Sequence, residues 1–289
     1  MHRISYASNG FRDRDIEAAL DSIAEAGFQF TELLGQAPHL PTPLTGRPLV
    51  HFRNRLESRG LQISSIHAPL GSHVLGAPDE VWRTQNVELF ASYVRFAGAV
   101  GADDIIIHPV PNPRYVDDAD NPAKPGKIEA AVYRSLDELV PVAAECGVRL
   151  LLENLPYKVN YPFRSLAALR PLVDGYPAAQ VGLVIDTGHA WIIGNDPATE
   201  IQTAGSRLWG THLQDVDYDD PEDSHWVPGH GGLDWTSIRQ ALAEVDYGGA
   251  WTLEVNHGRH GESPEAFAVA SFDIVRSWDI GAIQRPDAG

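Results

Sequence analysis

The chain has 289 residues, of which 43% are hydrophobic, and it carries a formal net charge of −17 at pH 7. This length and apolar content are enough for one large α/β barrel or for two small domains. Proteins bind nucleic acid mostly by neutralising phosphates with lysine and arginine, so a strongly acidic chain with three lysines and no basic run argues against a general nucleic-acid binder.

The sequence also gives no sign of export or membrane insertion. The first ten residues, MHRISYASNG, contain no apolar segment of the kind found in a secretory signal. No apolar stretch approaches the roughly 20 residues that span a bilayer. The single cysteine, Cys146, excludes an internal disulfide and a metal site built from several thiolates. We therefore expect a cytoplasmic protein with no membrane partner.

Strand-like and helix-like segments alternate along the chain. Apolar runs rich in β-branched residues predict strands at 2–7, 28–34, 61–67, 103–108, 149–154, 181–186, 208–213 and 250–255. Amphipathic stretches predict helices at 13–26, 46–59, 79–100, 127–146, 163–174, 196–205, 235–246 and 263–279. Eight such units in 289 residues (289/8, or about 36 residues each) are typical of a (β/α)8 TIM barrel.

Glycines at matched positions support this repeated architecture. Gly27, Gly60, Gly101 and Gly147 each lie between a predicted helix and the next strand, where glycine adopts the left-handed conformation that ends a helix. No linker divides the chain, so we expect one barrel domain over 1–284 and a frayed tail at 285–289.

Three predicted loops are longer than an ordinary turn between a strand and a helix. They cover 35–46, 110–126 and 216–233. Long loops at the active end of a barrel are often lids or binding loops.

Six of the predicted strands end in a side chain that can bind a metal. In a parallel barrel all strand C-termini meet at one face, so residues far apart in sequence can converge there. The six are His67, His108, Glu153, Asp186, His212 and Glu254.

The last four of these residues end strands five to eight, and we call them the tetrad. Three carboxylates and one imidazole suit Zn, Mn, Mg or Co. We predict that the tetrad, Glu153, Asp186, His212 and Glu254, binds a divalent metal ion.

Five further residues extend this pattern, and each has two interpretations. His67 and His108 either bind a second metal with Glu153, or orient a substrate or a neighbouring loop. His189 follows Asp186 by three residues and can face the same cavity. Asp223 and His225 either complete a third metal site with His189 or belong to a solvated acidic loop.

The motifs around these residues resemble the xylose isomerase-like TIM-barrel superfamily, which joins sugar isomerases and epimerases with endonuclease IV. The resemblance covers nearly the whole chain. It rests on HAP (67–69), HP (108–109), LLEN (151–154), VGLVIDTGH (181–189), THLQD (211–215), DSHWVPGHGGLDW (223–235) and YGGAWTLEVN (247–256).

The resemblance implies different metal counts in its two branches. In the sugar-processing branch, the residues matching the tetrad bind one divalent metal, and those matching Glu153 and Glu254 are the acid/base pair. In endonuclease IV, the residues matching the tetrad and the five further positions hold three zinc ions. All nine residues are present here, so the ligand set alone does not choose the branch.

Other positions favour the sugar-processing branch over endonuclease IV. Leu70 stands where endonuclease IV has a tyrosine that helps to open DNA, and His230 lies between two glycines where that enzyme has glutamate. Tyr218 stands where epimerases of free ketohexoses have an arginine, which argues against a ketohexose substrate.

We therefore predict a metal-dependent isomerase or epimerase of a sugar, sugar phosphate or related polyol. A metal-chelated carbonyl lowers the pKa of the neighbouring C–H, and Glu153 and Glu254 would transfer the proton. The predicted substrate contacts are His67, His108, His189, Trp191, Lys158 and His257.

Several alternatives stay open. One is an endonuclease IV-like phosphoesterase with several zinc ions, and another is a dehydratase or lyase on the same site. A barrel that only binds a ligand is a third. Association into a homo-oligomer is compatible with the sequence.

Overall fold

The computed structural model describes residues 3–278. Eight parallel strands form a closed barrel in chain order. The strands are β1 (Ile4–Ala7), β2 (Phe30–Leu34), β3 (Gln62–His67), β4 (Asp104–Ile107), β5 (Arg149–Glu153), β6 (Val181–Asp186), β7 (Leu208–Leu213) and β8 (Trp251–Leu253). The predicted TIM barrel is confirmed, whereas the boundary at 284 and the tail at 285–289 lie outside the described residues.

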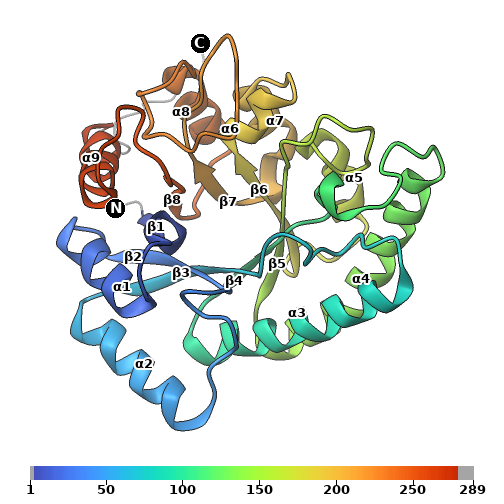
Figure 1. Cartoon of the computed structure of the whole chain (residues 1–289), viewed down its shortest axis with the longest axis horizontal. Coiled ribbons are helices and arrows are strands. Elements are labelled where there is room, and N and C mark those ends of the chain that lie inside the picture. The colour runs from blue at the N-terminus through green and yellow to red at the C-terminus, as the bar shows by residue number, and fades with distance from the viewer. Residues whose placement is uncertain (1–2, 279–289) are drawn as a thin grey trace, which may run out of the picture.

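Helices surround the barrel (Figure 1). They are α1 (Ile16–Glu25), α2 (Gly46–Ser58), α3 (Glu80–Val100), α4 (Lys124–Cys146), α5 (Leu166–Asp174), α6 (Thr187–Ile192), α7 (Pro197–Ala204), α8 (Trp235–Glu244) and α9 (Pro264–Ser277), with 3-10 turns η1 (Ser8–Phe11), η2 (Pro113–Tyr115) and η3 (Gly205–Arg207). The sequence pattern did not separate α6, which is a short helix directly after β6. Within residues 3–278 no helix has the length and apolar content needed to cross a bilayer.

The glycines between helices and strands have the expected conformation. Gly27, Gly60, Gly101 and Gly147 all have positive φ, between 67° and 102°. At Gly101 and Gly147 this conformation ends α3 and α4, and each glycine N–H donates back into the last helical turn. These glycines therefore turn the chain from helix to strand.

Successive side chains along a strand alternate between two hydrophobic layers. Ile105 and Ile107 of β4 belong to the large core between the strands and the helices, whereas Ile106 packs with Leu151 and Val184 in a small second cluster. Because successive side chains point to opposite faces, the second cluster lies inside the barrel. This packing places the strand ends around a filled interior.

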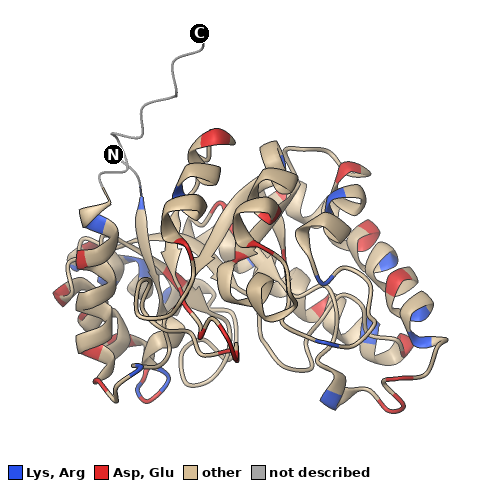
Figure 2. Cartoon of the chain, turned by 90° about the horizontal axis from the view of Figure 1, so that it is seen from above, with Lys and Arg blue, Asp and Glu red and all other residues tan. Residues whose placement is uncertain are grey.

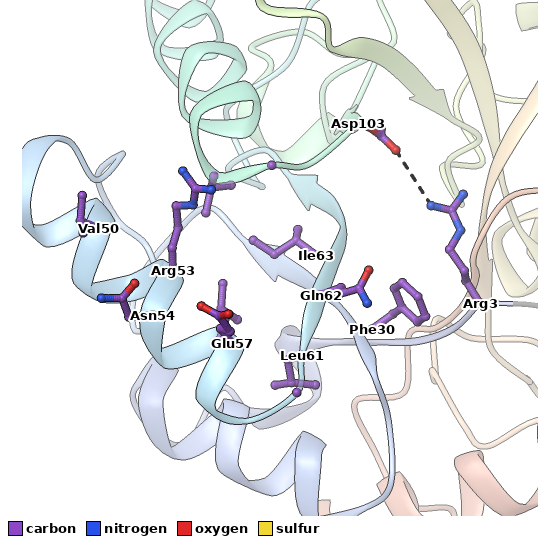
Figure 3. Close-up of a pocket in the computed structure, with 14 residues that line it drawn as sticks. Arg3, Phe30, Val50, Arg53, Asn54, Glu57, Leu61, Gln62, Ile63 and Asp103 are labelled. Carbon is purple, nitrogen blue, oxygen red and sulfur yellow. Dashed lines mark ion pairs between the residues drawn. The ribbon is translucent and has the colours of Figure 1, made fainter.

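A hollow of about 800 Å³ lies beside α2 and the beginnings of β2 and β3 (Figure 3). Its lining includes Phe30 and Gln62, which begin their strands, and the ion-paired Arg3 and Asp103 (4.0 Å). In a parallel barrel the strand beginnings lie opposite the strand ends. The hollow is therefore at the far end of the barrel from the predicted metal ligands.

The long segment between β7 and α8 is held down by Asp215. Asp215 and Trp226 exchange two backbone hydrogen bonds of 2.9 and 3.0 Å, which fold the segment back on itself. The fully buried Asp215 carboxylate accepts hydrogen bonds from Gly229 N (2.7 Å), Leu233 N (3.1 Å) and Trp235 Nε1 (2.8 Å). This anchoring fixes the part of the segment that carries Asp223 and His225.

We expect Asp215→Ala to lower the free energy of unfolding by about 3–5 kcal/mol, because several buried donors lose their acceptor together. Denaturant unfolding followed by circular dichroism measures this loss. Asp220→Ala, which removes an exposed carboxylate from the same segment, is the matched control and should leave the stability unchanged. Equal stability of the two variants would contradict the anchoring role.

Candidate metal centre

The tetrad residues meet at the C-terminal ends of the strands. Their ligand atoms all lie within 4.8 Å of one another. Glu153, Asp186 and His212 are the last or next-to-last residues of β5, β6 and β7, and Glu254 directly follows β8. All four are buried, with at most 4% of each residue exposed. Four residues from four strands therefore surround one point, as the strand-end pattern predicts.

A second group shares Glu153 with the tetrad. The Nε2 atoms of His67 and His108 lie 3.3 and 3.2 Å from the same carboxylate oxygen, Glu153 Oε2. These three residues offer ligand atoms within 4.8 Å of one another. The other oxygen, Glu153 Oε1, lies 3.0 Å from His212 Nδ1. Glu153 would thus be a ligand in both groups.

A third group lies beside the tetrad. Asp223 Oδ1 is 3.2 Å from His189 Nε2 and 3.0 Å from His225 Nε2. The side chain of Asp223 is 47% exposed, whereas both imidazoles are buried. The structure therefore brings together all five of the further residues, in the two groups that the sequence suggested.

The orientation of the imidazoles tests whether these groups suit a cation. His67, His189 and His225 each direct Nδ1 at a backbone carbonyl, at 2.8, 2.9 and 2.9 Å. A carbonyl can only accept a hydrogen bond, so each Nδ1 carries the hydrogen. In a neutral ring the Nε2 lone pair then faces a carboxylate oxygen about 3 Å away. That contact is repulsive unless a proton or a metal ion lies between the two atoms, so the residues fit divalent cations.

His212 has a carboxylate on each side. Its Nδ1 faces Glu153 Oε1 and Glu254 Oε2 at 3.0 and 3.2 Å, and its Nε2 faces Glu32 Oε1 at 3.1 Å. Glu32 is 1% exposed and lies on β2. The strand-end rule missed it because it lies inside a strand. The signal that could have found it is one carboxylate within the apolar run FTELL.

Two amide side chains also support the ligands, and the sequence analysis did not single them out. Asn9 Nδ2 donates to Glu254 Oε1. Gln214 Nε2 donates to Asp186 Oδ1 at 3.1 Å, while Gln214 Oε1 accepts from the backbone N–H of His225 at 3.0 Å. Gln214 therefore joins a tetrad ligand to the segment that carries the third group.

The pKa values of these groups reflect how the charges are paired. Burial works against ionisation of Glu153, but His212 and the neighbouring imidazoles hold its pKa well below the usual range. Burial raises the pKa of Asp186 to about 7. Burial would lower the pKa of His225, but the carboxylates of Asp223 and Glu254 raise it to about 9. Without a metal, His225 therefore retains its proton at neutral pH, whereas burial lowers the pKa of His108.

A cavity of about 480 Å³ opens above the three groups. Glu153 and Glu254 line it, so both predicted acid/base residues can be reached by a small molecule. Five of the other predicted residues line it as well: these are His108, His189, Asp223, His225 and His257.

Other predicted substrate contacts lie outside this lining. His67 is buried among the ligands. Trp191 packs against Tyr218, with ring centroids 4.9 Å apart, and donates to the Tyr218 carbonyl. Lys158 is exposed and is absent from the lining. Sequence proximity to a strand end did not determine which way these side chains point.

Two arginines stand at the rim of the cavity. Arg12 follows η1, and Arg114 lies in η2, where its guanidinium is 5.6 Å from the Tyr115 ring centroid. Neither has a carboxylate partner among the ion pairs of residues 3–278. Elsewhere in the described chain, Lys and Arg are scattered among acidic residues (Figure 2).

Known proteins are similar to this chain in sequence and in fold. A D-psicose 3-epimerase of Enterocloster bolteae is 28% identical over 244 residues, which cover 83% of this chain and 76% of that protein. Among solved structures, a D-tagatose 3-epimerase-like protein has a TM-score of 0.80 at 20% identity and covers 96% of both chains. The 3-keto-D-glucoside 4-epimerase of E. coli has a TM-score of 0.76 at 18% identity, covering 96% of this chain and 100% of that one.

The structural matches show the fold. The family model described as xylose isomerase-like TIM barrel matches residues 20–278, which is most of the chain. This match agrees with the closed parallel barrel and with the motifs at the strand ends. The chain therefore belongs to the xylose isomerase-like TIM-barrel family.

Proposed function

We propose that the protein is a metal-dependent isomerase or epimerase of a sugar, sugar phosphate or related polyol. The observation that carries this proposal is that Glu153 and Glu254, at opposite ends of the tetrad in strand order, both line a cavity of about 480 Å³. A space of this size accommodates a small sugar. The named activities of the relatives, which are sugar epimerases, support the same class.

The tetrad would hold a divalent ion through three carboxylates and His212. When bound there, such an ion supplies Lewis acidity that polarises a substrate carbonyl and acidifies the neighbouring C–H. The donor set of oxygen and imidazole nitrogen suits Zn, Mn, Mg or Co. The position of His212 Nδ1, 3.0 Å from Glu153 Oε1 and 3.2 Å from Glu254 Oε2, supports this role.

The two glutamates would move the proton. The low pKa of Glu153 keeps it ionised and able to accept a proton from substrate carbon. Glu254 Oε1 accepts a hydrogen bond from Asn9, and Glu254 Oε2 lies 3.2 Å from His212 Nδ1. Either glutamate can remove the proton while the other returns one to the opposite face, and this exchange inverts or relocates a stereocentre.

The rim favours a substrate with a negatively charged group. Arg12 and Arg114 line the cavity and have no carboxylate partner in the described part of the chain, whereas Glu153 and Glu254 make its floor acidic. A phosphate or carboxylate at the end of the substrate remote from the reacting carbon would bind these guanidinium groups. We therefore favour a sugar phosphate or a sugar acid over a free ketohexose.

A phosphoesterase is the second candidate, and one specific observation favours it. Glu153 Oε2 lies against His67 and His108 of the second group, and Oε1 lies against His212 of the tetrad. Occupancy of both groups would therefore leave this glutamate no free oxygen to act as a base. Several divalent ions held close together activate water and stabilise a leaving oxygen in phosphoester hydrolysis. The number of ions at working concentrations therefore separates the two candidates.

Turnover in heavy water tests the proton-transfer proposal. We expect a sugar phosphate or sugar acid that the protein converts to gain solvent deuterium at the reacting carbon, as followed by NMR. Glu254→Gln should keep the fold and lose activity by about 100-fold or more, the usual effect of removing a general acid or base. Turnover without deuterium incorporation, or hydrolysis of abasic DNA at enzyme-like rates, would contradict the proposal.

Metal content tests the three groups. We expect more than one zinc ion per chain at pH 8 in the wild type, measured by elemental analysis after removal of loosely bound metal. His225→Ala should lose one ion, because the third group then has two ligands. His73→Ala, which changes a histidine outside the groups, is the matched control. One ion per chain in both the wild type and His225→Ala would restrict binding to the tetrad.

The metal affinity of the third group should still change with pH between 7 and 9, above the pKa of an ordinary histidine. The pKa of His225 is about 9 in the metal-free protein, so this ring is protonated at lower pH and must lose its proton to bind metal. Below pH 9 the affinity of the third group should fall about tenfold per pH unit. Competition with a chromophoric chelator at pH 7 and pH 8 measures the change. An unchanged dissociation constant would show that His225 is already neutral.

A further inference from the structure

Glu32 contacts a tetrad ligand without belonging to any ligand group in the described chain. Its carboxylate lies 3.1 and 3.3 Å from His212 Nε2, on the side of the ring opposite Glu153 and Glu254. Glu32 is 1% exposed. Burying a carboxylate is costly unless hydrogen bonds or an opposite charge compensate for the lost solvation, so the position of Glu32 beside His212 suggests that the two groups stabilise each other.

The barrel fixes this carboxylate before any ion binds. The pairing of β2 with β3 shifts register between Thr31 and Glu32, so that Glu32 pairs with Ser65. Irregular pairing of this kind re-aims a side chain. Ser65 Oγ donates to Glu32 Oε2 at 2.6 Å, while Glu32 Oε1 faces His212. The neighbouring strand thus holds one oxygen, and both oxygens lie within 3.3 Å of the imidazole nitrogen.

This contact favours one ring nitrogen of His212 as the metal ligand. Only Nδ1 faces the tetrad carboxylates of Glu153 and Glu254, so an ion held there would meet the lone pair of Nδ1, and Nε2 would carry the hydrogen and donate it to Glu32. An anionic acceptor also increases the basicity of the ring more than a neutral carbonyl does. The outward nitrogens of His67, His189 and His225 all meet backbone carbonyls.

We propose that Glu32 is a positioning residue that orients His212 and makes the tetrad the tightest of the three candidate metal sites. The inference rests on the proposed metal-dependent function, but it concerns metal affinity and not turnover. It predicts that the first equivalent of metal binds at the tetrad, with His212 bound through Nδ1.

The test compares zinc affinity in three purified full-length variants by chelator competition. Glu32→Ala should weaken the tightest site by about 10–100-fold, the range found when the partner of a ligating histidine is removed. Glu32→Gln keeps an acceptor but loses the charge, so it should lie between Glu32→Ala and the wild type. Glu200→Gln is the matched control, because Glu200 is also a buried carboxylate (4% exposed) but lies on α7 with backbone donors from α5.

A spectroscopic measurement separates positioning from general destabilisation. In nitrogen-15 NMR of the zinc-loaded wild type, His212 should have zinc at Nδ1 and a slowly exchanging proton at Nε2. Glu32→Ala should lose that protected proton, whereas Glu200→Gln should retain it. If both Glu32 variants fail to fold, Ser65→Ala removes the 2.6 Å bond to Glu32, together with the 3.3 Å contact to Ser64 Oγ, and should weaken zinc binding several-fold.

The outcomes are distinct. The proposal is overturned if Glu32→Ala folds and binds zinc with wild-type affinity. If the Glu32 variants do not fold, wild-type zinc affinity in Ser65→Ala overturns it. A loss of zinc affinity in Glu200→Gln as large as that in Glu32→Ala also overturns it. A wild type that binds no zinc overturns the metal site as well. Zinc binding that depends on Glu32 in a protein that isomerises no sugar supports the inference and refutes the proposed reaction.

Discussion

The structure depends on one electrostatic constraint, which is the burial of several carboxylates around His212. Glu32, Glu153, Asp186 and Glu254 are each at most 4% exposed, and their oxygens lie within a few ångströms of the imidazoles. Ionised carboxylates buried this closely are costly unless cations or protons offset the charge. The ring nitrogens that face these oxygens have no neutral arrangement free of repulsion, so the cluster is built to hold protons or divalent metal ions.

The barrel supplies the rigidity that this cluster requires. Each tetrad ligand comes from a different strand or from the residue directly after it, and neighbouring strands are joined by backbone hydrogen bonds. The third group depends on a loop, but Asp215 and Gln214 attach that loop to the barrel end. The site therefore combines ligands fixed by the sheet with ligands placed by an anchored segment. We expect substitutions in that segment to change the metal affinity of the third group first.

Periodicity in the sequence predicts the elements and their order, but it does not predict the direction of individual side chains. Alternating segments and the four helix-ending glycines predict the barrel, and the strand-end rule brings Glu153 and Glu254 together because parallel strands share one active face. Glu32 escapes that rule because it lies inside β2, where a shift in strand pairing re-aims its side chain. Lys158 lies five residues after the end of β5, in the loop that follows a tetrad ligand, yet it is exposed. The boundary of α6 depends on local capping, because the Asp186 side chain accepts a hydrogen bond from the backbone N–H of His189 at the start of this helix. The sequence pattern predicts Asp186 as a metal ligand and does not identify it as a helix cap.

The central claim is that the buried carboxylates and imidazoles form a metal site with the tetrad at its centre. Anomalous diffraction from crystals of the zinc-loaded protein, recorded on both sides of the zinc absorption edge, tests it most directly. The account predicts a strong peak about 2.0–2.2 Å from His212 Nδ1 and from carboxylate oxygens of the tetrad, with further peaks beside His108 and between His189 and His225. A fully loaded crystal with no peak at the tetrad, or with zinc bound only at the protein surface, would contradict it.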